Sequence, residues 1–347
     1  MGRLRGGLGR AVLGVAISII ALALVVRNVD LAAAWEALRN ADPRWVALLF
    51  AFLAVDILLR AVRWRVLLAP LAAVSFRDTL ASLLVGYLAN NVLPARLGEI
   101  VRSHDLGERT GVSRSAILGT IVIERIVDTF VVVSIAAAAI LVLSVRGVVA
   151  SAVMVGFAIT ALLIVGVAIG IYAHRLPGAD RVRVFLGRWP RVRGAVSKLR
   201  TGLSVASDWH TMVWAVVLSV GSWSCTVLAF AAAAQAVGVE PTMGQAALLA
   251  AGTNLATAVP AGPGYVGTFE LAAVAIAASV GIAREPALAF AVLVHAATLL
   301  LTSIGGAIAL MLGGRRRSTV TREAVAPEGV VSVRAASEGA APAEGDR

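Results

Sequence analysis

Long apolar runs, each about the length of a membrane-spanning helix, constrain the fold of this 347-residue chain more than any other feature. A helix needs ~20 mostly apolar residues to cross the hydrocarbon core of a bilayer. The sequence is 59% hydrophobic, with a mean hydropathy of +0.88. The runs that reach or approach this length are residues 11–26, 45–68, 115–144, 148–173, 209–236 and 286–312. We therefore predict an all-α polytopic membrane protein with six spanning helices.

The first run follows three basic residues, Arg3, Arg5 and Arg10. That pattern is typical of a signal peptide, with a conceivable cleavage site at residues 32–34, or of a signal anchor. We expect the run to be retained as the first spanning helix.

Two segments are predicted to lie on the membrane surface. Residues 31–38 place Leu31, Trp35 and Leu38 on one helical face. The basic segment 175–207 has apolar residues at spacings of three and four, as in an amphipathic helix on an anionic leaflet, with Pro190 expected to interrupt it.

Two stretches, residues 86–99 and 254–270, place Asn in an apolar segment, continue with Pro and Gly, and close with Glu. Within hydrocarbon, non-helical backbone is tolerated only where it is buried in protein or lines a watery cavity. We predict that each stretch forms a re-entrant hairpin around a polar site, at about residues 77–112 and 242–282. The hairpin-forming residues are expected to be Pro94, Gly98, Pro260, Gly262, Gly264 and Gly267.

Charged residues also occur inside the predicted spans. Asp56 and Arg60 are four residues apart and should neutralise each other on one helical face. Arg63 and Arg65 lie near the end of that span and are expected to snorkel. In residues 124–128, two carboxylates and one guanidinium lie near midplane depth, where they must face the protein interior. A self-satisfied packing network and a substrate site are both open for this group.

The basic residues predict the orientation. Placing both termini in the cytoplasm leaves five arginines outside: Arg27, Arg39, Arg44, Arg146 and Arg284. The first hairpin then enters from the cytoplasm and the second from outside. Residues 45–144 and 209–312 therefore become inverted repeats of one unit, the architecture of alternating-access carriers.

A polar site between such hairpins would suit an anionic group, because helix N-termini, arginines and amides all bind phosphate. The carboxylates could bind a cationic group or carry a coupling proton. The candidate substrate-binding residues are Asn90, Asn91, Arg96, Glu99, Arg102, Glu124, Arg125, Asp128, Asn254 and Glu270. His295 occupies the position in the last span that corresponds to Glu124, and we expect it to be a packed, hydrogen-bonded histidine.

No cofactor or metal site is predicted. The four histidines lack zinc-ligand spacing, and the single cysteine excludes an internal disulfide. The glycines at 262, 264 and 267 match a dinucleotide fingerprint, but no strand precedes them. We expect no nucleic acid partner. The cationic residues are 30 Arg and one Lys, which fits phosphate recognition or a bias in the proteome's composition.

Three motifs, at residues 87–99, 124–128 and 260–270, resemble the flippase-like membrane region of lysylphosphatidylglycerol synthases, in the same order and within about residues 10–313. In full-length synthases a cytoplasmic domain transfers the aminoacyl group, and the membrane region is implicated in moving the lipid outward. No other stretch of this chain is long enough for that transferase, so the resemblance implies lipid translocation rather than aminoacylation.

The leading hypothesis is a carrier in the cell membrane, formed by residues 1–313, that moves an anionic or zwitterionic lipid or a polyprenyl-phosphate-linked sugar between leaflets. One alternative is an integral-membrane transferase with a carboxylate at 99, 124, 128 or 270 as general base. A second is a scaffold for a cell-envelope synthase. Residues 314–347 have no apolar period and are expected to form a disordered cytoplasmic tail.

Overall fold

The computed structural model describes residues 2–93, 97–172, 190–257 and 261–325. Three predicted residues, Pro94, Arg96 and Pro260, lie outside the described residues, as do positions 175–189 of the basic segment and 326–347 of the tail. The chain divides into two units, Met1–Ala309 and Leu310–Arg347. The first unit contains the helix bundle with its apolar cores.

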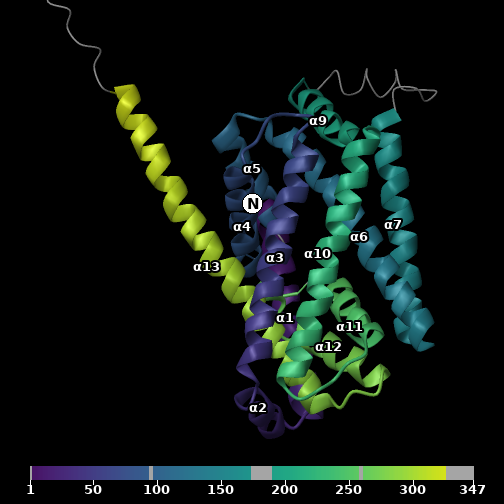
Figure 1. Ribbon diagram of the computed structural model, residues 1–347. Helices are drawn as coiled ribbons and strands as arrows, with labels where there is room; N and C mark the ends of the chain where they lie inside the picture. The colour runs from purple at the N-terminus through teal and green to yellow at the C-terminus, as the bar shows by residue number, and fades with distance from the viewer. Residues whose placement is uncertain (1, 94–96, 173–189, 258–260, 326–347) are drawn as a thin grey trace, which may run out of the picture. The chain divides into compact units, whose positions relative to one another are not determined.

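Every regular element among the described residues is a helix (Figure 1). The helices are α1 (Gly2–Asn28), α2 (Leu31–Arg39), α3 (Pro43–Leu68), α4 (Phe76–Val92), α5 (Gly98–Thr110), α6 (Arg114–Leu143), α7 (Val148–Tyr172), α9 (Pro190–Leu203), η3 (Ser204–Ser207), α10 (Trp209–Ala236), α11 (Met243–Ala256), η4 (Pro263–Tyr265), α12 (Thr268–Ser279) and α13 (Arg284–Val325). The predicted all-α class is therefore confirmed. Pro190 is the first residue of α9, where proline is well tolerated, and the part of the segment before it lies outside the described residues. Helix α13 continues beyond residue 314, where the tail was predicted to begin.

Four described helices are long and apolar enough to cross a membrane: α3, α6, α10 and residues 284–313 of α13. A fifth candidate is the pair formed by α1 and α2, which bend by 89° at the break between them. Helix α7 corresponds to the predicted fourth span, and its shorter described core, Val153–Gly166, is also apolar. The structure thus supports four to five spans in a chain predicted to have six.

The element order long helix, broken pair, long helix occurs twice, as α3, α4 and α5, α6 and again as α10, α11 and α12, α13. The helices of each broken pair pack against each other. Local sequence explains several helix starts: Asp42 and Ser75 cap α3 and α4, and Thr242 forms a capping box with Gln245 at α11. The two halves of the bundle therefore share one order of elements.

Helices α3 and α10 lie side by side through the middle of the unit (Figure 1). Asp42 N–H donates to the Ala236 carbonyl (2.9 Å) where α3 begins and α10 ends. Further along α3, the Ser222 hydroxyl donates to Asp56, and the Arg63 guanidinium donates to the Ser219 hydroxyl (2.7 Å). These contacts connect the two helices over most of the length of α3.

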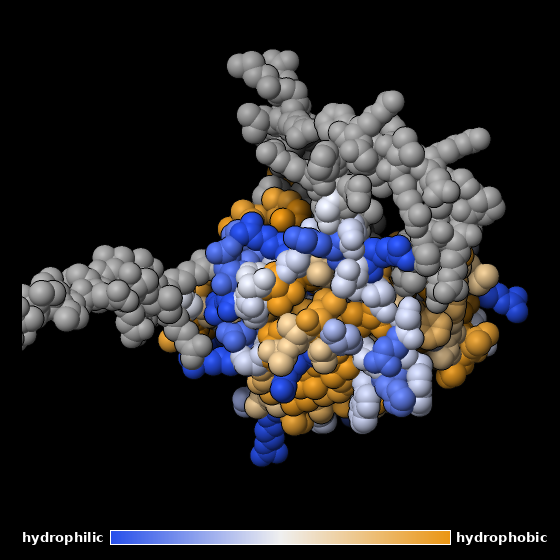
Figure 2. Space-filling model, turned by 90° about the horizontal axis from the view of Figure 1, so that it is seen from above, coloured by the Kyte–Doolittle hydropathy of each residue, from blue (hydrophilic) through white to orange (hydrophobic). Residues whose placement is uncertain are grey.

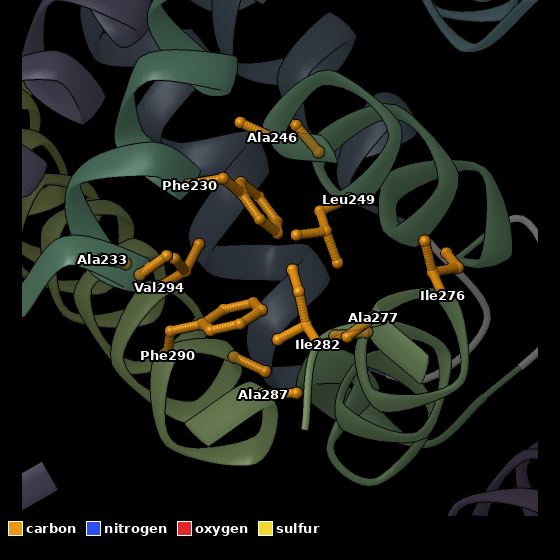
Figure 3. Close-up of a cluster of buried hydrophobic side chains, with 14 of the residues drawn as sticks. Phe230, Ala233, Ala246, Leu249, Ile276, Ala277, Ile282, Ala287, Phe290 and Val294 are labelled. Carbon is orange, nitrogen blue, oxygen red and sulfur yellow. The ribbon is translucent and has the colours of Figure 1, made fainter. Parts of the chain in front are cut away.

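Two apolar cores flank this helix pair. One contains Leu49 and Leu53 of α3 with side chains of α10 to α13, including Phe230 and Phe290 (Figure 3). The other contains Trp64 of α3 with side chains of α5, α6, α9 and η3. The two broken pairs therefore share apolar cores with opposite halves of α3.

Figure 2 views the end of the molecule at which α9 lies, and hydrophilic side chains gather on its described part beside hydrophobic surface. Arg77, Arg114 and Lys198 are among the exposed residues of the segments at this end. The close fit of α9 against α6 depends on glycine, because a Cβ on Gly202 would lie 2.1 Å from the Ala116 carbonyl oxygen.

Candidate functional site

A cavity of about 890 Å³ lies between the broken pairs and the long helices. Its wall includes residues of α3, α4, α5, α6, α7, α10, α11, α12 and α13, so both repeats contribute. Helix α7 supplies an apolar part of the wall with Val153, Ile159 and Leu163. The charged part of the wall consists of Asp56, Arg60, Glu99, Arg125 and Asp128.

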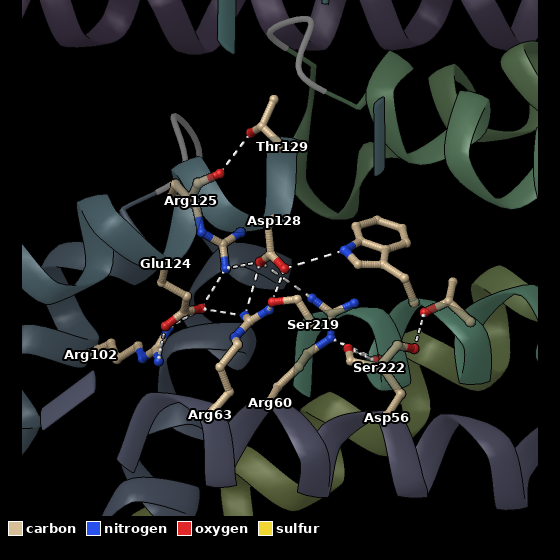
Figure 4. Close-up of polar contacts among 12 residues, drawn as sticks. Asp56, Arg60, Arg63, Arg102, Glu124, Arg125, Asp128, Thr129, Ser219 and Ser222 are labelled. Atoms are coloured by element: carbon tan, nitrogen blue, oxygen red, sulfur yellow. Dashed lines mark hydrogen bonds and ion pairs between the residues drawn. The ribbon is translucent and has the colours of Figure 1, made fainter. Parts of the chain in front are cut away.

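A buried network of charges lies beside this cavity, centred on Glu124 of α6 (Figure 4). The Glu124 side chain is fully buried and accepts hydrogen bonds from three guanidinium groups: Arg63 (3.1 Å), Arg102 (2.7 and 3.1 Å) and Arg125 (2.6 Å). Asp128 shares Arg63 and Arg125 with Glu124, so the three guanidinium groups exceed the two carboxylates by one positive charge. Such an excess favours an additional anion at an accessible edge of the network.

Asp128, one turn further along α6, is the second acceptor of the network. Arg63 donates to both of its carboxylate oxygens, and an Arg125 nitrogen forms an ion pair with it at 3.1 Å. The Trp223 indole N–H donates from 3.3 Å, and an Arg60 nitrogen lies 3.8 Å away. Glu124 and Asp128 lie on one face of α6, since both bind the same Arg63.

The expectation that Arg63 snorkels is wrong. Its side chain is fully buried and connects α3 with both carboxylates of α6 and with Ser219 of α10. A guanidinium has five donors in a planar fork and can bind several carboxylates at once, which an outward-pointing side chain could not exploit. Arg65 points elsewhere: it is exposed and donates to the Val74 carbonyl (3.1 Å). The sequence signal for Arg63 was its position seven residues after Asp56, which places both on one side of α3.

The predicted pair of Asp56 and Arg60 is confirmed, with both carboxylate oxygens of Asp56 2.9 Å from the Arg60 Nε. Both residues also lie on the cavity wall. Neither was among the predicted site residues, although a charged pair four residues apart within a span is itself a functional signal.

The structure brings six of the ten candidate residues to the cavity wall: Asn90, Asn91, Glu99, Arg125, Asp128 and Asn254. Arg102 and Glu124 lie behind the wall in the buried network, and the Arg102 guanidinium packs 3.4 Å from the centre of the Trp64 ring. Arg96 lies outside the described residues. Glu270 is buried behind His295, which does reach the wall.

The three asparagines also have structural partners. Asn90 accepts a hydrogen bond from the Gly98 N–H (2.8 Å) and so connects the two helices of the first broken pair. Asn91 donates to two hydroxyls of α13, Thr302 (2.9 Å) and Ser303 (3.0 Å). Asn254 donates to the Ala250 carbonyl within its own helix.

Two charged side chains remain available to the cavity. Arg125 has a side chain 44% exposed, whereas those of its partners Glu124 and Asp128 are 0% and 7% exposed. Glu99, in the first turn of α5, is half-buried and forms no ion pair with any described residue. A guanidinium and a carboxylate on one wall can hold an anionic group together with a neighbouring cationic one.

The second broken pair carries a glutamate in contact with a histidine of α13. His295 Nδ1 lies 2.6 Å from Glu270 Oε1, and its Nε2 lies 2.7 Å from the Gly264 carbonyl oxygen. The prediction of a packed, hydrogen-bonded histidine is confirmed. The predicted hairpin glycines also have geometric reasons, since Gly264 and Gly267 adopt positive φ values of 65° and 86°. Gly98 lies so close to Gly86 that an added Cβ would be 2.2 Å from its carbonyl oxygen.

Comparison with known proteins finds relatives of this sequence. The chain is 26% identical over 334 residues to the glycosyltransferase AglD of Haloferax volcanii. The alignment covers 85% of this chain and 53% of that protein. It is 29% identical over 119 residues to a UPF0104 membrane protein of Methanothermobacter thermautotrophicus, covering 33% of this chain and 35% of that one. The chain thus spans about half the length of the first relative and about a third of the second.

The family model described as the lysylphosphatidylglycerol synthase TM region matches residues 11–306. That range includes every described helix from α2 to α12, the buried charge network and the whole cavity wall. On this match, the chain belongs to the lysylphosphatidylglycerol synthase membrane-region family.

Proposed function

We propose that this protein is a carrier that moves the head group of an anionic or zwitterionic lipid, or of a polyprenyl-phosphate-linked sugar, across the cytoplasmic membrane through the cavity. The observation that carries the proposal is the presence of Arg125 and Glu99 on one cavity wall built from both repeats. Lipids of these classes share a phosphate, which a guanidinium binds through two parallel hydrogen bonds.

The size and lining of the cavity support a head group as its occupant. A volume of about 890 Å³ lies within the range of small-molecule sites and is too small for two full acyl chains as well. The acyl chains of the lipid would lie against the apolar part of the wall that α7 contributes. Arg125 keeps donors for a ligand, because a guanidinium has five and the network uses only part of them.

The arrangement of the broken pairs supports alternating access. They share apolar cores with opposite halves of α3, as expected if α4 and α5 enter the membrane from one side and α11 and α12 from the other. With α1 and α7 counted as spans, this gives six spans and two re-entrant pairs in inverted repeats, and cytoplasmic termini by charge distribution. In this proposal the two broken pairs open the cavity in turn.

The test uses purified protein in vesicles of phosphatidylcholine and phosphatidylglycerol that contain fluorescent phosphatidylglycerol. Dithionite added outside quenches only the outer-leaflet probe, so the slow loss of the protected signal measures translocation. We expect Arg125→Ala to lower the rate about tenfold or more, because a hydrogen bond to a charged group contributes ~1.5–3 kcal/mol. Arg146→Ala, which alters an exposed loop, is the matched control.

Arg125→Ala should leave the fold intact. Glu124 keeps its contacts with Arg63 and Arg102, and Asp128 keeps Arg63. If Arg125→Ala, folded and as thermostable as the control, moves the probe at the wild-type rate, the cavity is not the translocation route for this lipid.

A transferase that acts on a lipid-linked substrate is the second candidate, favoured by the name of the relative from Haloferax volcanii. Glu99 would be the general base, since it faces the cavity without an ion pair to a described residue. Mass spectrometry of the vesicle lipids after incubation with an activated sugar donor separates the candidates, because a carrier leaves the mass of the lipid unchanged and a transferase does not.

A further inference from the structure

The contact between Glu270 and His295 needs one hydrogen more than a neutral histidine and an ionised glutamate carry together. Both residues are buried, and the His295 ring stacks on Phe269 at a centroid distance of 4.5 Å. One ring nitrogen faces a carboxylate oxygen of Glu270 and the other faces the carbonyl oxygen of Gly264. Both ring nitrogens therefore face oxygen acceptors.

The Gly264 carbonyl can only accept, so Nε2 must carry a hydrogen. Glu270 Oε2 already accepts from the Gly267 N–H (2.7 Å). A hydrogen must therefore lie between Nδ1 and Oε1, on either atom. Both arrangements, imidazolium with carboxylate or imidazole with carboxylic acid, hold one proton more than a neutral histidine beside an ionised glutamate.

We propose that Glu270 and His295 form a proton-binding site whose occupancy holds the Gly264 turn in place, so that lipid translocation by this chain is coupled to a proton. The coupling rests on the proposed carrier function, whereas the proton site itself does not. The site is distinct from the charge network of α6, since its two residues come from α12 and α13.

Loss of the proton would act on the Gly264 turn. The remaining ring hydrogen would stay on Nδ1, because a hydrogen bond to a carboxylate is stronger than one to a carbonyl. Nε2 would then present a lone pair to the Gly264 oxygen, and the contact would repel. The turn is poised to rearrange, since Tyr265 holds a positive φ of 58°, which a residue with a side chain rarely adopts.

Movement of this turn would reach both the cavity and the first broken pair. Tyr265 lies on the cavity wall. A Cβ placed on Gly264 would lie 3.7 Å from the Asn91 carbonyl oxygen, so the two broken pairs approach each other here. A proton on one pair can thus alter how the other pair packs.

Among the described hydrogen-bond and ring partners of His295, which are Glu270, Gly264 and Phe269, Glu270 is the ionisable one. On its own helix the described neighbours one turn away, Ala291, Val292, Thr298 and Leu299, carry no charge. The other ionisable residues of the cavity wall are Asp56, Arg60, Tyr87, Glu99, Arg125, Asp128 and Tyr265. Asp56, Arg60, Arg125 and Asp128 are held in ion pairs with one another or with the rest of the network.

Solid-state NMR of the full chain in vesicles, with ¹⁵N-labelled histidine rings, tests the proton site directly. The chain has four histidines, so the His295 signals can be assigned by their loss in His295→Gln, with His210→Gln as an exposed control. Infrared difference spectra between the wild type and Glu270→Gln report a protonated Glu270 carboxyl group.

The proposal expects either doubly protonated His295 or protonated Glu270 at neutral pH, and release of that proton as the pH is raised. In Glu270→Gln, the amide N–H₂ can donate to Nδ1 of a neutral ring, so the His295 signal should no longer show that transition. A neutral His295 beside an ionised Glu270 at neutral pH, or the same titration in Glu270→Gln and wild type, would overturn it.

The fluorescent phosphatidylglycerol assay then tests the coupling. The proposal expects a translocation rate that changes at least threefold across the wild-type transition and is flat with pH in Glu270→Gln. A wild-type rate that stays constant while the NMR transition occurs would overturn the coupling. Absence of translocation at every pH with the NMR transition intact would instead contradict the carrier function and leave the proton site standing.

Discussion

Replacing Arg63 with alanine should destabilise the fold far more than the same change two residues along the helix, at Arg65. Arg63 is fully buried and donates to two carboxylates and to Ser219. Breaking a buried ion pair by removing one partner costs ~3–5 kcal/mol. The lower end of that range applies, about 3 kcal/mol, because Glu124 keeps Arg102 and Arg125 after the change. Arg65 is exposed and makes one hydrogen bond, so its loss costs about 1 kcal/mol or less.

At about 2 °C per kcal/mol, these costs correspond to a fall in the apparent Tm of about 6 °C for Arg63→Ala and about 2 °C for Arg65→Ala. The assay is thermal unfolding of detergent-purified protein followed by tryptophan fluorescence, since Trp223 donates to Asp128 within the network. Arg63→Lys should fall between the wild type and Arg63→Ala, because lysine keeps the charge and loses the planar fork. Equal shifts for the two alanine variants would refute the reasoning that Arg63 stabilises the helix bundle.

Two further predictions concern a glycine and a helix cap. Gly98→Ala should lower Tm by several degrees, because its Cβ would lie 2.2 Å from the Gly86 carbonyl oxygen. Gly166→Ala, at a position with open space around it, should leave Tm unchanged. Equal melting temperatures for the two variants would contradict the close approach of α4 and α5. At the start of α10, the Thr211 hydroxyl donates to Asp208 and lowers the pKa of that carboxyl below its ordinary value. This lowered pKa stabilises the folded protein at pH values above ~3.9, the pKa of the carboxyl in the unfolded chain. The added stability is lost as the pH falls through the lower pKa of the folded protein. Asp208→Asn should thus melt below the wild type at pH 7 and converge with it below about pH 4, as Tm measured against pH would test.

Much of the fold was predictable because hydrocarbon permits few backbone conformations. The apolar runs located α3, α6, α10 and residues 284–313 of α13 within a few residues, and the combination of Asn, Pro and Gly located both helix breaks. The number of spans depends on the membrane as well as the chain, and apolar length alone does not decide it for the bent pair of α1 and α2.

The candidate site was predictable in its residue types more than in its partners. Six predicted residues line one cavity although more than 160 residues separate Asn90 from Asn254, because both follow the same local rule for a helix break. The role of Arg63 was missed, since its position near a helix end fits an outward side chain equally well. Whether Arg63 faces α6 or lipid depends on tertiary packing, which the spacing of residues along α3 alone does not determine.

The cross-links between α3 and α10 restrict which parts of the molecule can change shape. They run from Asp42 to Arg63 along α3, a rise of ~32 Å, which matches the thickness of the hydrocarbon layer. Contacts distributed over such a length hold α3 and α10 together as one rigid pair. In the proposed transport cycle, the moving parts would then be the interrupted helices. Their backbone can bend at the break without loss of a continuous series of amide hydrogen bonds.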